Sequence, residues 1–346
     1  MKKYLFVLML FISMATLAQK SITIEDFTMR PTFGARSVSG INWMKDGKFY
    51  SSLQNNKVVK FNITTGEAVE TLVDGGALSP ALNIDDYSFS ADEKQILIST
   101  GFEPIYRRSF RASYFIYDIA TKTVKKLSDN GKQSYATFSP DGTKVAFTRD
   151  NNLFYVSLND MKETQVTTDG KFNEIINGST DWVYEEEFGF TTAFFWSPDN
   201  NKLAYYRFDE SKVKEYNMQK WNQGATYPQD YKFKYPKAGE ANSVIEIYVY
   251  DLSTQQKIKA DLGSNTDIYI PRVMWTKDAN TLSIRRMNRL QNQLEIMHLN
   301  TISGAISIVL TEKNKAYVDI NDDLTYGHYV SFLHQHLMKI KMTSTP

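Results

Sequence analysis

The string Phe138-Ser139-Pro140-Asp141-Gly142, followed by Val145-Ala146-Phe147, contains the pattern that decides the fold. An aromatic residue ends one strand, a Pro-Asp-Gly turn reverses the chain, and an apolar second strand follows. The pattern recurs four more times, beginning at Trp43, Phe89, Trp196 and Trp275. Further segments of alternating polarity lie between the copies and predict strands at 58–63, 114–119, 153–158, 245–252 and 294–299.

The spacing of the copies predicts the architecture. The first three begin at residues 43, 89 and 138, so they are 46 and 49 residues apart, close to the period of about 40 to 50 residues for a four-stranded propeller blade. The next two begin at residues 196 and 275, so two blades carry insertions, which usually mark a functional face. We therefore predict an all-β fold, a β-propeller of four-stranded antiparallel blades. About five blades are complete and a partial sixth begins over residues 317–326.

The insertion before Trp196 contains the string Asp181-Trp182-Val183-Tyr184-Glu185-Glu186-Glu187. Asp181 is placed to cap a short helix, with the glutamates in or near its first turn, where exposed N–H groups and the helix dipole favour negative charge. One interpretation is a capped surface helix, since runs of charge are usually solvated. The longer insertion, 209–239, is rich in Tyr, Lys, Gln and Pro and is expected to form a loop arm.

The composition narrows the function classes. The chain has 346 residues, of which 42% are hydrophobic and 14% aromatic, enough for a large core. The net charge of +1 gives no electrostatic support for a nucleic-acid partner. There is no cysteine, which excludes disulfides, thiol nucleophiles and Cys-ligated metal sites.

The N-terminal residues are typical of a secretory signal peptide. Lys2 and Lys3 precede an apolar run over residues 4–12, and small residues end at Ala18. An uncleaved membrane anchor is the alternative, but the run is shorter than the roughly 20 residues that a span needs. We expect residues 1–18 to be a signal peptide cleaved after Ala18. The mature chain would then be exported to the periplasm or the extracellular space, with no membrane span.

Residues 327–346 lose the alternation and the turn residues of the repeats. They contain a His-x-His pair, His334 and His336, but without a nearby third ligand this is weak evidence for metal, and no metal site is expected. We interpret this tail as the product of a premature end or a change of reading frame. The expected propeller domain is 19–326.

Two strings resemble dipeptidyl peptidase IV, a serine exopeptidase of the prolyl oligopeptidase family. Residues 181–187 resemble the glutamate motif of that family, which interrupts a propeller blade, and Tyr106-Arg107-Arg108-Ser109-Phe110 resembles its arginine loop. Further matching strings stand in the same order at 112–114, 116–118, 195–199, 202–205, 235–239 and Asn242. The resemblance covers roughly residues 21–326.

The resemblance implies an eight-bladed propeller, followed by an α/β-hydrolase domain, that releases N-terminal Xaa-Pro or Xaa-Ala dipeptides. Glu186 and Glu187 would bind the free α-ammonium group of the substrate, and Arg107 would hold one of its carbonyl oxygens. Glu185 would support the helix end. The neighbouring Arg108 leaves the register open by one, and an ordinary loop arginine is the alternative for Arg107. The resemblance implies no cofactor, a peptide substrate as partner, and a homodimer for the complete protein.

The catalytic residues of a serine peptidase are absent from the printed sequence. No Gly-x-Ser-x-Gly string occurs, no histidine precedes His298, and the helix–strand alternation of an α/β-hydrolase domain is missing. We therefore expect this chain alone to be inactive, as the propeller of a peptidase whose hydrolase domain is missing or separately encoded. The alternative is a free-standing exported propeller that binds peptides or a protein partner without catalysis. A downstream DNA segment encoding Gly-x-Ser-x-Gly, then Asp and His, would distinguish the first from the second.

Overall fold

The computed structural model describes residues 22–29, 32–34 and 40–326. The expected signal peptide (1–18) and non-matching tail (327–346) lie outside these residues. The described residues divide into two units, one ending at Asn42 and one beginning at Trp43. In the first, helix α2 (Ile24–Thr28) begins at Thr23, whose backbone N–H donates to the Asp26 carboxylate over 3.1 Å. No helix in the described part of the chain is long and apolar enough to cross a membrane.

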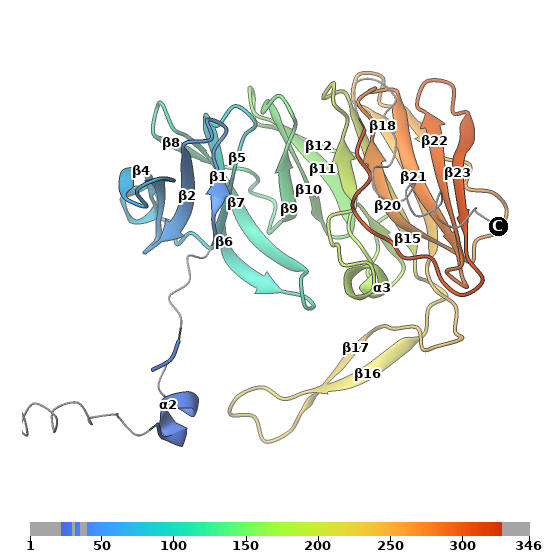
Figure 1. The fold of residues 1–346 in the computed structure, drawn as a ribbon, viewed down its shortest axis with the longest axis horizontal. Helices are drawn as coiled ribbons and strands as arrows, with labels where there is room; N and C mark the ends of the chain where they lie inside the picture. Colours follow the sequence, from blue (N-terminus) through green and yellow to red (C-terminus); the bar gives the residue numbers. More distant parts are fainter. Residues whose placement is uncertain (1–21, 30–31, 35–39, 327–346) are drawn as a thin grey trace, which may run out of the picture. The chain divides into compact units, whose positions relative to one another are not determined.

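Five antiparallel sheets, here called blades 1 to 5, follow one another in chain order (Figure 1). Blade 1 contains β1 (Asn42–Trp43), β2 (Phe49–Gln54), β3 (Lys57–Asn62) and β4 (Ala68–Asp74), after which the 3₁₀ turn η1 (Gly75–Ala77) follows. Blade 2 contains β5 (Asp86–Phe89), β6 (Gln95–Pro104), β7 (Phe110–Asp118) and β8 (Thr123–Lys126). Blade 3 contains β9 (Ser134–Phe138), β10 (Lys144–Arg149), β11 (Asn152–Ser157) and β12 (Lys162–Gln165).

Blade 4 contains β13 (Ile175–Asn177), β14 (Phe194–Trp196), β15 (Lys202–Asp209), β18 (Val244–Asp251) and β19 (Lys257–Lys259). Blade 5 contains β20 (Ile268–Trp275), β21 (Thr281–Asn288), β22 (Gln293–Asn300) and β23 (Ile306–Lys313). In blade 4 both β13 and β14 pair with β15, at opposite ends of that strand. The first strand of this blade is therefore interrupted, and helix α3 (Trp182–Glu186) lies in the interruption.

The repeat predicted from the sequence is confirmed strand by strand. In each blade the repeat aromatic is the last residue of the strand that precedes the turn: Trp43, Phe89, Phe138, Trp196 and Trp275. The turns of blades 1, 3 and 4 have a left-handed backbone, with φ of +65° at Gly47, +71° at Gly142 and +64° at Asn200. Glycine and asparagine adopt this conformation at low cost, which explains the turn residues of these three blades; in blade 2 the position is taken by Glu93, with φ of +59°.

Neighbouring blades pack face to face through apolar side chains. Blades 1 and 2 share a buried cluster that includes Val58 and Ile96, and blades 2 and 3 share one that includes Leu97 and Phe147. Equivalent clusters join blades 3 and 4 and blades 4 and 5. Because β-strand side chains alternate between faces, each inner blade can contribute to both of its interfaces. Burying a large apolar side chain in such a cluster contributes on the order of 1.5–3 kcal/mol.

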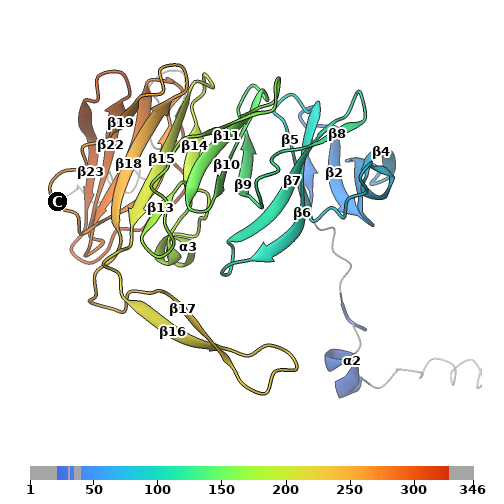
Figure 2. The same ribbon diagram turned by 180° about the vertical axis from the view of Figure 1, so that it is seen from behind.

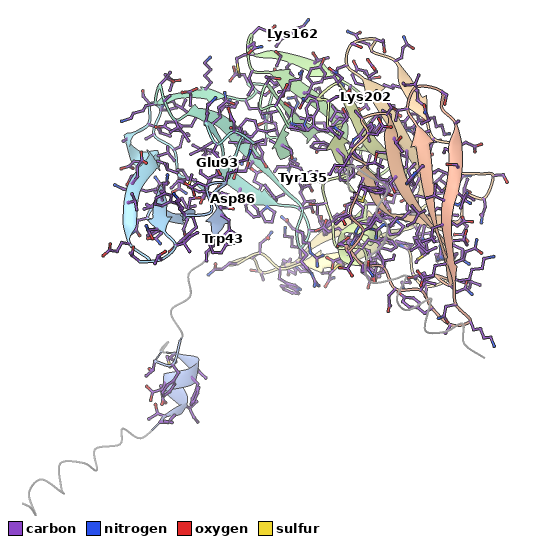
Figure 3. The ribbon with its side chains drawn as sticks, turned by 45° about the horizontal axis from the view of Figure 1, so that its top comes forward. Trp43, Asp86, Glu93, Tyr135, Lys162 and Lys202 are labelled. Carbon is purple, nitrogen blue, oxygen red and sulfur yellow. The ribbon has the colours of Figure 1, made fainter. Side chains whose placement is uncertain are left out.

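The first strands of blades 2 to 5 line a common cleft of about 820 Å³. Its walls include Asp86 and Tyr135, which Figure 3 labels, and the repeat aromatics Trp196 and Trp275. The indole N–H of Trp275 donates to the Phe195 carbonyl oxygen of the preceding blade over 3.0 Å. The first strands of these blades therefore face a shared centre, as in a propeller.

Two segments differ from the sequence-based expectation. The expected loop arm is a regular hairpin of β16 (Glu215–Lys220) and β17 (Gln229–Lys234), which projects from blade 4 (Figure 2). Residues 317–326 form no strand, so the expected start of a sixth blade is not seen in the described residues. Instead, Val318 and Leu324 are buried beside blade 5, and the Arg285 guanidinium donates to the Asn321 carbonyl oxygen. The segment therefore packs on blade 5 without forming a strand of its own.

Candidate functional site

Helix α3 begins at Asp181, as the sequence predicts. The Asp181 carboxylate accepts the Tyr184 backbone N–H over 3.0 Å and the Ser243 hydroxyl over 2.6 Å. Burial raises the pKa of Asp181, and these hydrogen bonds oppose the rise. The cap therefore fixes the start of the helix and also joins it to the segment before β18.

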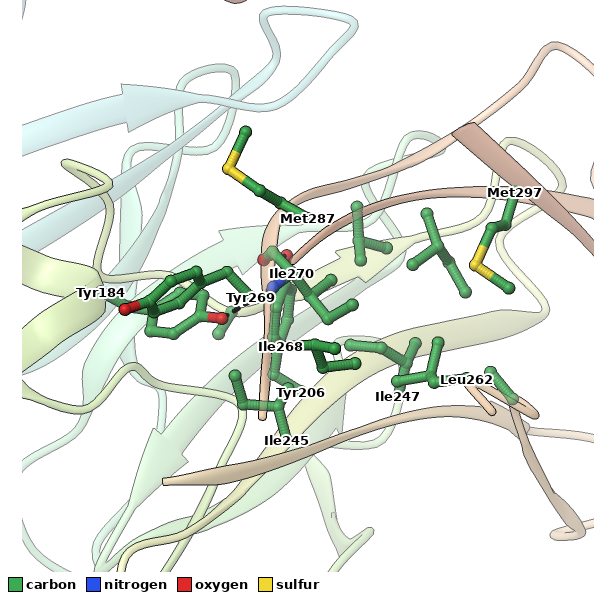
Figure 4. Close-up of a cluster of buried hydrophobic side chains, with 14 of the residues drawn as sticks. Tyr184, Tyr206, Ile245, Ile247, Leu262, Ile268, Tyr269, Ile270, Met287 and Met297 are labelled. Atoms are coloured by element: carbon green, nitrogen blue, oxygen red, sulfur yellow. Dashed lines mark hydrogen bonds between the residues drawn. The ribbon is translucent and has the colours of Figure 1, made fainter. Parts of the chain in front are cut away.

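The buried hydroxyl of Tyr184 anchors the helix to blade 5 (Figure 4). It accepts the Ile270 backbone N–H over 2.7 Å, and the Tyr206 hydroxyl donates to the Ile270 carbonyl oxygen over 3.0 Å. The β20–β21 register shifts between Tyr269 and Arg272, so Ile270 lies where the strand ladder is broken. The two tyrosines supply the hydrogen bonds that the ladder does not provide there.

We expect Tyr184→Phe to lower the free energy of unfolding by about 1–3 kcal/mol, because the buried Ile270 N–H loses its acceptor. The measurement is the midpoint of urea unfolding at an unchanged slope. Tyr227→Phe, at a hydroxyl-bearing side chain that is 81% exposed, is the control and should change stability by less than about 0.5 kcal/mol. Equal midpoints for the two variants would show that the anchor contributes nothing.

The arginine loop, residues 105–109, joins β6 to β7 and lies against helix α3. The Glu185 Oε1 atom accepts the backbone N–H of Arg108 over 2.6 Å and that of Ser109 over 2.9 Å. In return, the Arg108 guanidinium donates to the Glu185 backbone carbonyl oxygen over 2.6 Å. The structure therefore places two insertions from blades 2 and 4 in direct contact, although 77 residues separate Arg108 from Glu185.

Arg107 points to the adjacent carboxylate of the helix. Its Nε atom lies 3.2 Å from Glu186 Oε2; the Arg107 side chain is 71% exposed and that of Glu186 only 15%. Glu187 is exposed, and its carboxylate has no hydrogen-bond or ion-pair partner among the described residues. Two carboxylates and one guanidinium leave one negative charge uncompensated at the surface.

Aromatic side chains of the hairpin base adjoin both parts of the site. The Tyr106 ring lies 5.7 Å from that of Phe233, and the Trp182 ring lies 4.2 Å from that of Tyr235. Burial raises the pKa of Tyr106, so this hydroxyl stays neutral in the physiological range. The hairpin base thus packs against the arginine loop and the helix at the same time.

The structure brings together the residues that the sequence singled out, Arg107 and Glu186, with Glu187 next in the chain. The two arginines have different partners: Arg107 forms an ion pair with Glu186, whereas Arg108 donates to the Glu185 backbone carbonyl oxygen. Glu185 does not support the end of its own helix as expected; its carboxylate binds the arginine loop. Nothing in the spacing of the sequence indicates that contact. No cluster of three or more His, Asp or Glu side chains suited to a metal occurs in the described ranges.

The comparisons with known proteins agree on one family. Residues 90–339 match the family described as "Dipeptidyl peptidase IV (DPP IV) N-terminal region", a match that runs past the boundary at 326 set from the sequence. The chain is 27% identical to "Probable dipeptidyl peptidase 4" of Aspergillus flavus, over 90% of this chain and 44% of the relative. It is 30% identical to "Inactive dipeptidyl peptidase 10" of Rattus norvegicus, over 77% of this chain and 34% of the relative.

The crystal structure of Porphyromonas gingivalis dipeptidyl peptidase 4 superposes with a TM-score of 0.81 at 41% identity. The match covers 87% of this chain and 43% of that one. The chain thus spans less than half the length of the relatives named here. On the match over residues 90–339, this chain belongs to the family of dipeptidyl peptidase IV N-terminal regions.

Proposed function

We propose that this chain is the substrate-recognition portion of an exported, dipeptidyl peptidase IV-like serine exopeptidase that releases N-terminal Xaa-Pro or Xaa-Ala dipeptides. Its role would be to bind the free amino end of the peptide. The observation that carries the proposal is the arrangement of Arg107, Glu186 and Glu187, with one carboxylate unpartnered among the described residues. Family membership supports the enzyme class, and residues 1–18 support export.

The charges of the site favour an ammonium ligand. One unit of negative charge is uncompensated, and a protonated amino end supplies one positive charge with three N–H donors. A peptide nitrogen within a chain is a neutral amide and cannot compensate a carboxylate that the ligand desolvates. The site would therefore select the end of a peptide. A fixed distance from this point to a nucleophile would set cleavage after the second residue.

Arg107 can serve a second part of the same ligand. Its guanidinium has five N–H donors, and its Nε atom forms an ion pair with Glu186 at 3.2 Å. The donors belong to a largely exposed side chain and are available to a carbonyl oxygen of the bound peptide. Arg108 is also exposed, but its guanidinium is held by a 2.6 Å hydrogen bond to the Glu185 carbonyl oxygen, whereas Arg107 is held only by an ion pair. These contacts favour Arg107 as the substrate arginine.

The test compares two peptides of the same sequence, Ala-Pro-Ala-Ala with a free amino end and its N-acetylated form. We expect the free peptide to bind at least about tenfold more tightly by calorimetric titration, since one charge-assisted contact of about 1.4 kcal/mol gives that ratio. Binding should weaken as the pH rises through about 8, where the amino end loses its proton. Equal affinity for the two peptides would refute the proposal.

A second candidate function is non-catalytic peptide binding by a free-standing propeller. The observation that favours it is the similarity to a relative whose name includes the word inactive. Both candidates share the ammonium site, so the peptide titration does not separate them. Dipeptide release by the complete protein separates them, because only the first candidate predicts turnover.

A further inference from the structure

Glu185 is buried at the centre of the site, with only 1% of its surface exposed. A carboxylate in such a place is costly unless hydrogen bonds satisfy it. Its two neighbours in the sequence are less buried, since Glu187 is exposed and the Glu186 side chain is 15% exposed, so Glu185 has a different role from theirs. Its Oε1 atom already accepts two backbone N–H groups, and its burial keeps it away from a ligand.

The bonds of Glu185 hold one side of the arginine loop. They fix the backbone of Arg108 and Ser109, the two residues that follow Arg107. The loop is also closed on itself, since the Ser109 hydroxyl accepts the Tyr106 backbone N–H over 3.0 Å. On the other side of Arg107, the Tyr106 ring lies against Phe233 of the hairpin. The backbone of Arg107 is therefore held on both sides, while its side chain stays exposed.

This arrangement explains how an exposed arginine can keep a defined direction. A free arginine side chain loses considerable rotamer entropy when a ligand orders it. A fixed backbone limits the places that the guanidinium can reach before binding, so less conformational entropy is lost on binding. The same carboxylate group that fixes the loop belongs to the helix that carries Glu186. Glu185 thus sets the distance between the arginine loop and helix α3, and with it the spacing of the two polar groups that would contact one peptide end.

We propose that Glu185 is a positioning residue that holds the arginine loop against helix α3, so that Arg107 and Glu186 can engage the same peptide amino end. The inference rests on the proposed function, because its ligand is the ammonium group proposed above. Its effect on the ligand would pass through Arg107, which distinguishes it from a residue that only stabilises the fold.

The test uses Glu185→Met, which keeps the side-chain length and removes the acceptor, and Glu185→Gln, which retains an amide oxygen for the two N–H groups. We expect Glu185→Met to weaken binding of free Ala-Pro-Ala-Ala about fivefold, and binding of the acetylated peptide less, because that peptide has no ammonium group to lose from Glu186. Glu185→Gln should restore most of the affinity. Arg108→Met, at an exposed side chain, removes the reciprocal bond and should weaken binding several-fold. This variant supplies the test if Glu185→Met fails to fold.

Thr167→Val is the matched control. Thr167 is buried just after β12, and its hydroxyl accepts the backbone N–H of Leu153 in blade 3 over 2.9 Å. The variant therefore also loses a buried acceptor but lies outside the site. It should lower stability and leave the ratio of free to acetylated affinity unchanged. In addition, Glu185→Met should have no further effect on peptide affinity once Arg107→Met is present, because the two act in series.

The outcomes separate the two proposals. If the parent chain does not discriminate between the free and acetylated peptides, the proposed function fails. If the parent discriminates but folded Glu185→Met and Arg108→Met retain the full ratio, Glu185 is a structural residue and this inference fails. Independent, additive effects of Glu185→Met and Arg107→Met would overturn it as well.

Discussion

Replacing Glu186 or Glu187 by glutamine is expected to lower kcat/KM for dipeptide release by hundreds- to thousands-fold in an enzyme that contains this site. Glutamine keeps the shape of the side chain and removes its charge. The ammonium group of the substrate would then lose one of the two carboxylates proposed to bind it. Breaking such a charge pair in a desolvated site costs on the order of 3–5 kcal/mol, and each 1.4 kcal/mol is about tenfold. Stability should change little, because glutamine keeps the side-chain volume, Glu187 is exposed, and the partner of Glu186, Arg107, is itself largely exposed.

The size of this effect depends on burial. Glu187 is exposed in this chain, and an exposed ion pair contributes only about 0–1 kcal/mol because water and salt screen it. We therefore expect the glutamine variants of this chain alone to lose less than about tenfold in peptide affinity. The large loss should appear only when the rest of the enzyme covers the ligand and excludes water. The two settings together test whether desolvation gives the site its strength.

A chimera provides the enzyme setting. In it, this chain replaces the matching 43% of Porphyromonas gingivalis dipeptidyl peptidase 4, and release of a chromogenic group from a Xaa-Pro substrate is measured. Glu67→Gln, at an exposed carboxylate of blade 1, is the control and should turn over like the parent. Parent-like turnover by both the Glu186→Gln and Glu187→Gln chimeras would leave helix α3 as a capped surface element.

The blades could be predicted from the sequence because their signal is local. An aromatic residue, a tight turn and an apolar strand follow one another closely along the chain, and this unit repeats. The Gly142 and Asn200 turns show the cause, since each needs a positive φ that these residue types adopt at low cost. The Asp181 cap was predictable for the same reason, as its partner Tyr184 is three residues away.

The details of the site depend on contacts that no local pattern encodes. Glu185 and Arg108 are 77 residues apart, and their spacing follows from how blades 2 and 4 are placed around the centre. The polar composition of residues 215–234 predicts a loop, whereas the structure shows a hairpin. The strands were not apparent because the alternating aromatic residues stand among many polar ones. The sixth blade was expected because residues 317–326 look like a strand, but strand formation needs a neighbour with free hydrogen-bonding groups.

The second large effect concerns Glu210, which follows β15 at the base of the hairpin. Its side chain is 6% exposed. Burial raises the pKa of Glu210 to about 7; the Asp181 carboxylate adds to this rise, Lys234 opposes it, and Asp209 adds a smaller contribution. The pKa of the Tyr106 hydroxyl is raised first by burial, then by Tyr231 and by the Glu210 charge. Glu210 therefore holds a proton in the folded chain over a range in which the unfolded chain has released it.

The sign of the pH effect follows from this difference. The unfolded chain releases the proton near pH 4.5, and the folded chain near pH 7. Between these values the folded state binds more protons than the unfolded state, so its stability falls as the pH rises. The contribution of Glu210 is complete below pH 4.5 and is lost as the pH passes through about 7. At 1.36 kcal/mol per unit, the loss is about 3 kcal/mol.

We therefore expect Glu210→Gln to flatten the stability profile. The free energy of unfolding of the variant, measured in urea from pH 4.5 to 8, should gain about 3 kcal/mol relative to the parent over that interval, because no charge is buried at high pH. Asp181 is present in both proteins, so its own titration largely cancels in the difference between them. Glu67→Gln, at an exposed carboxylate, should run parallel to the parent. A Glu210→Gln profile that also runs parallel would mean that Glu210 titrates in the folded chain as it does in water.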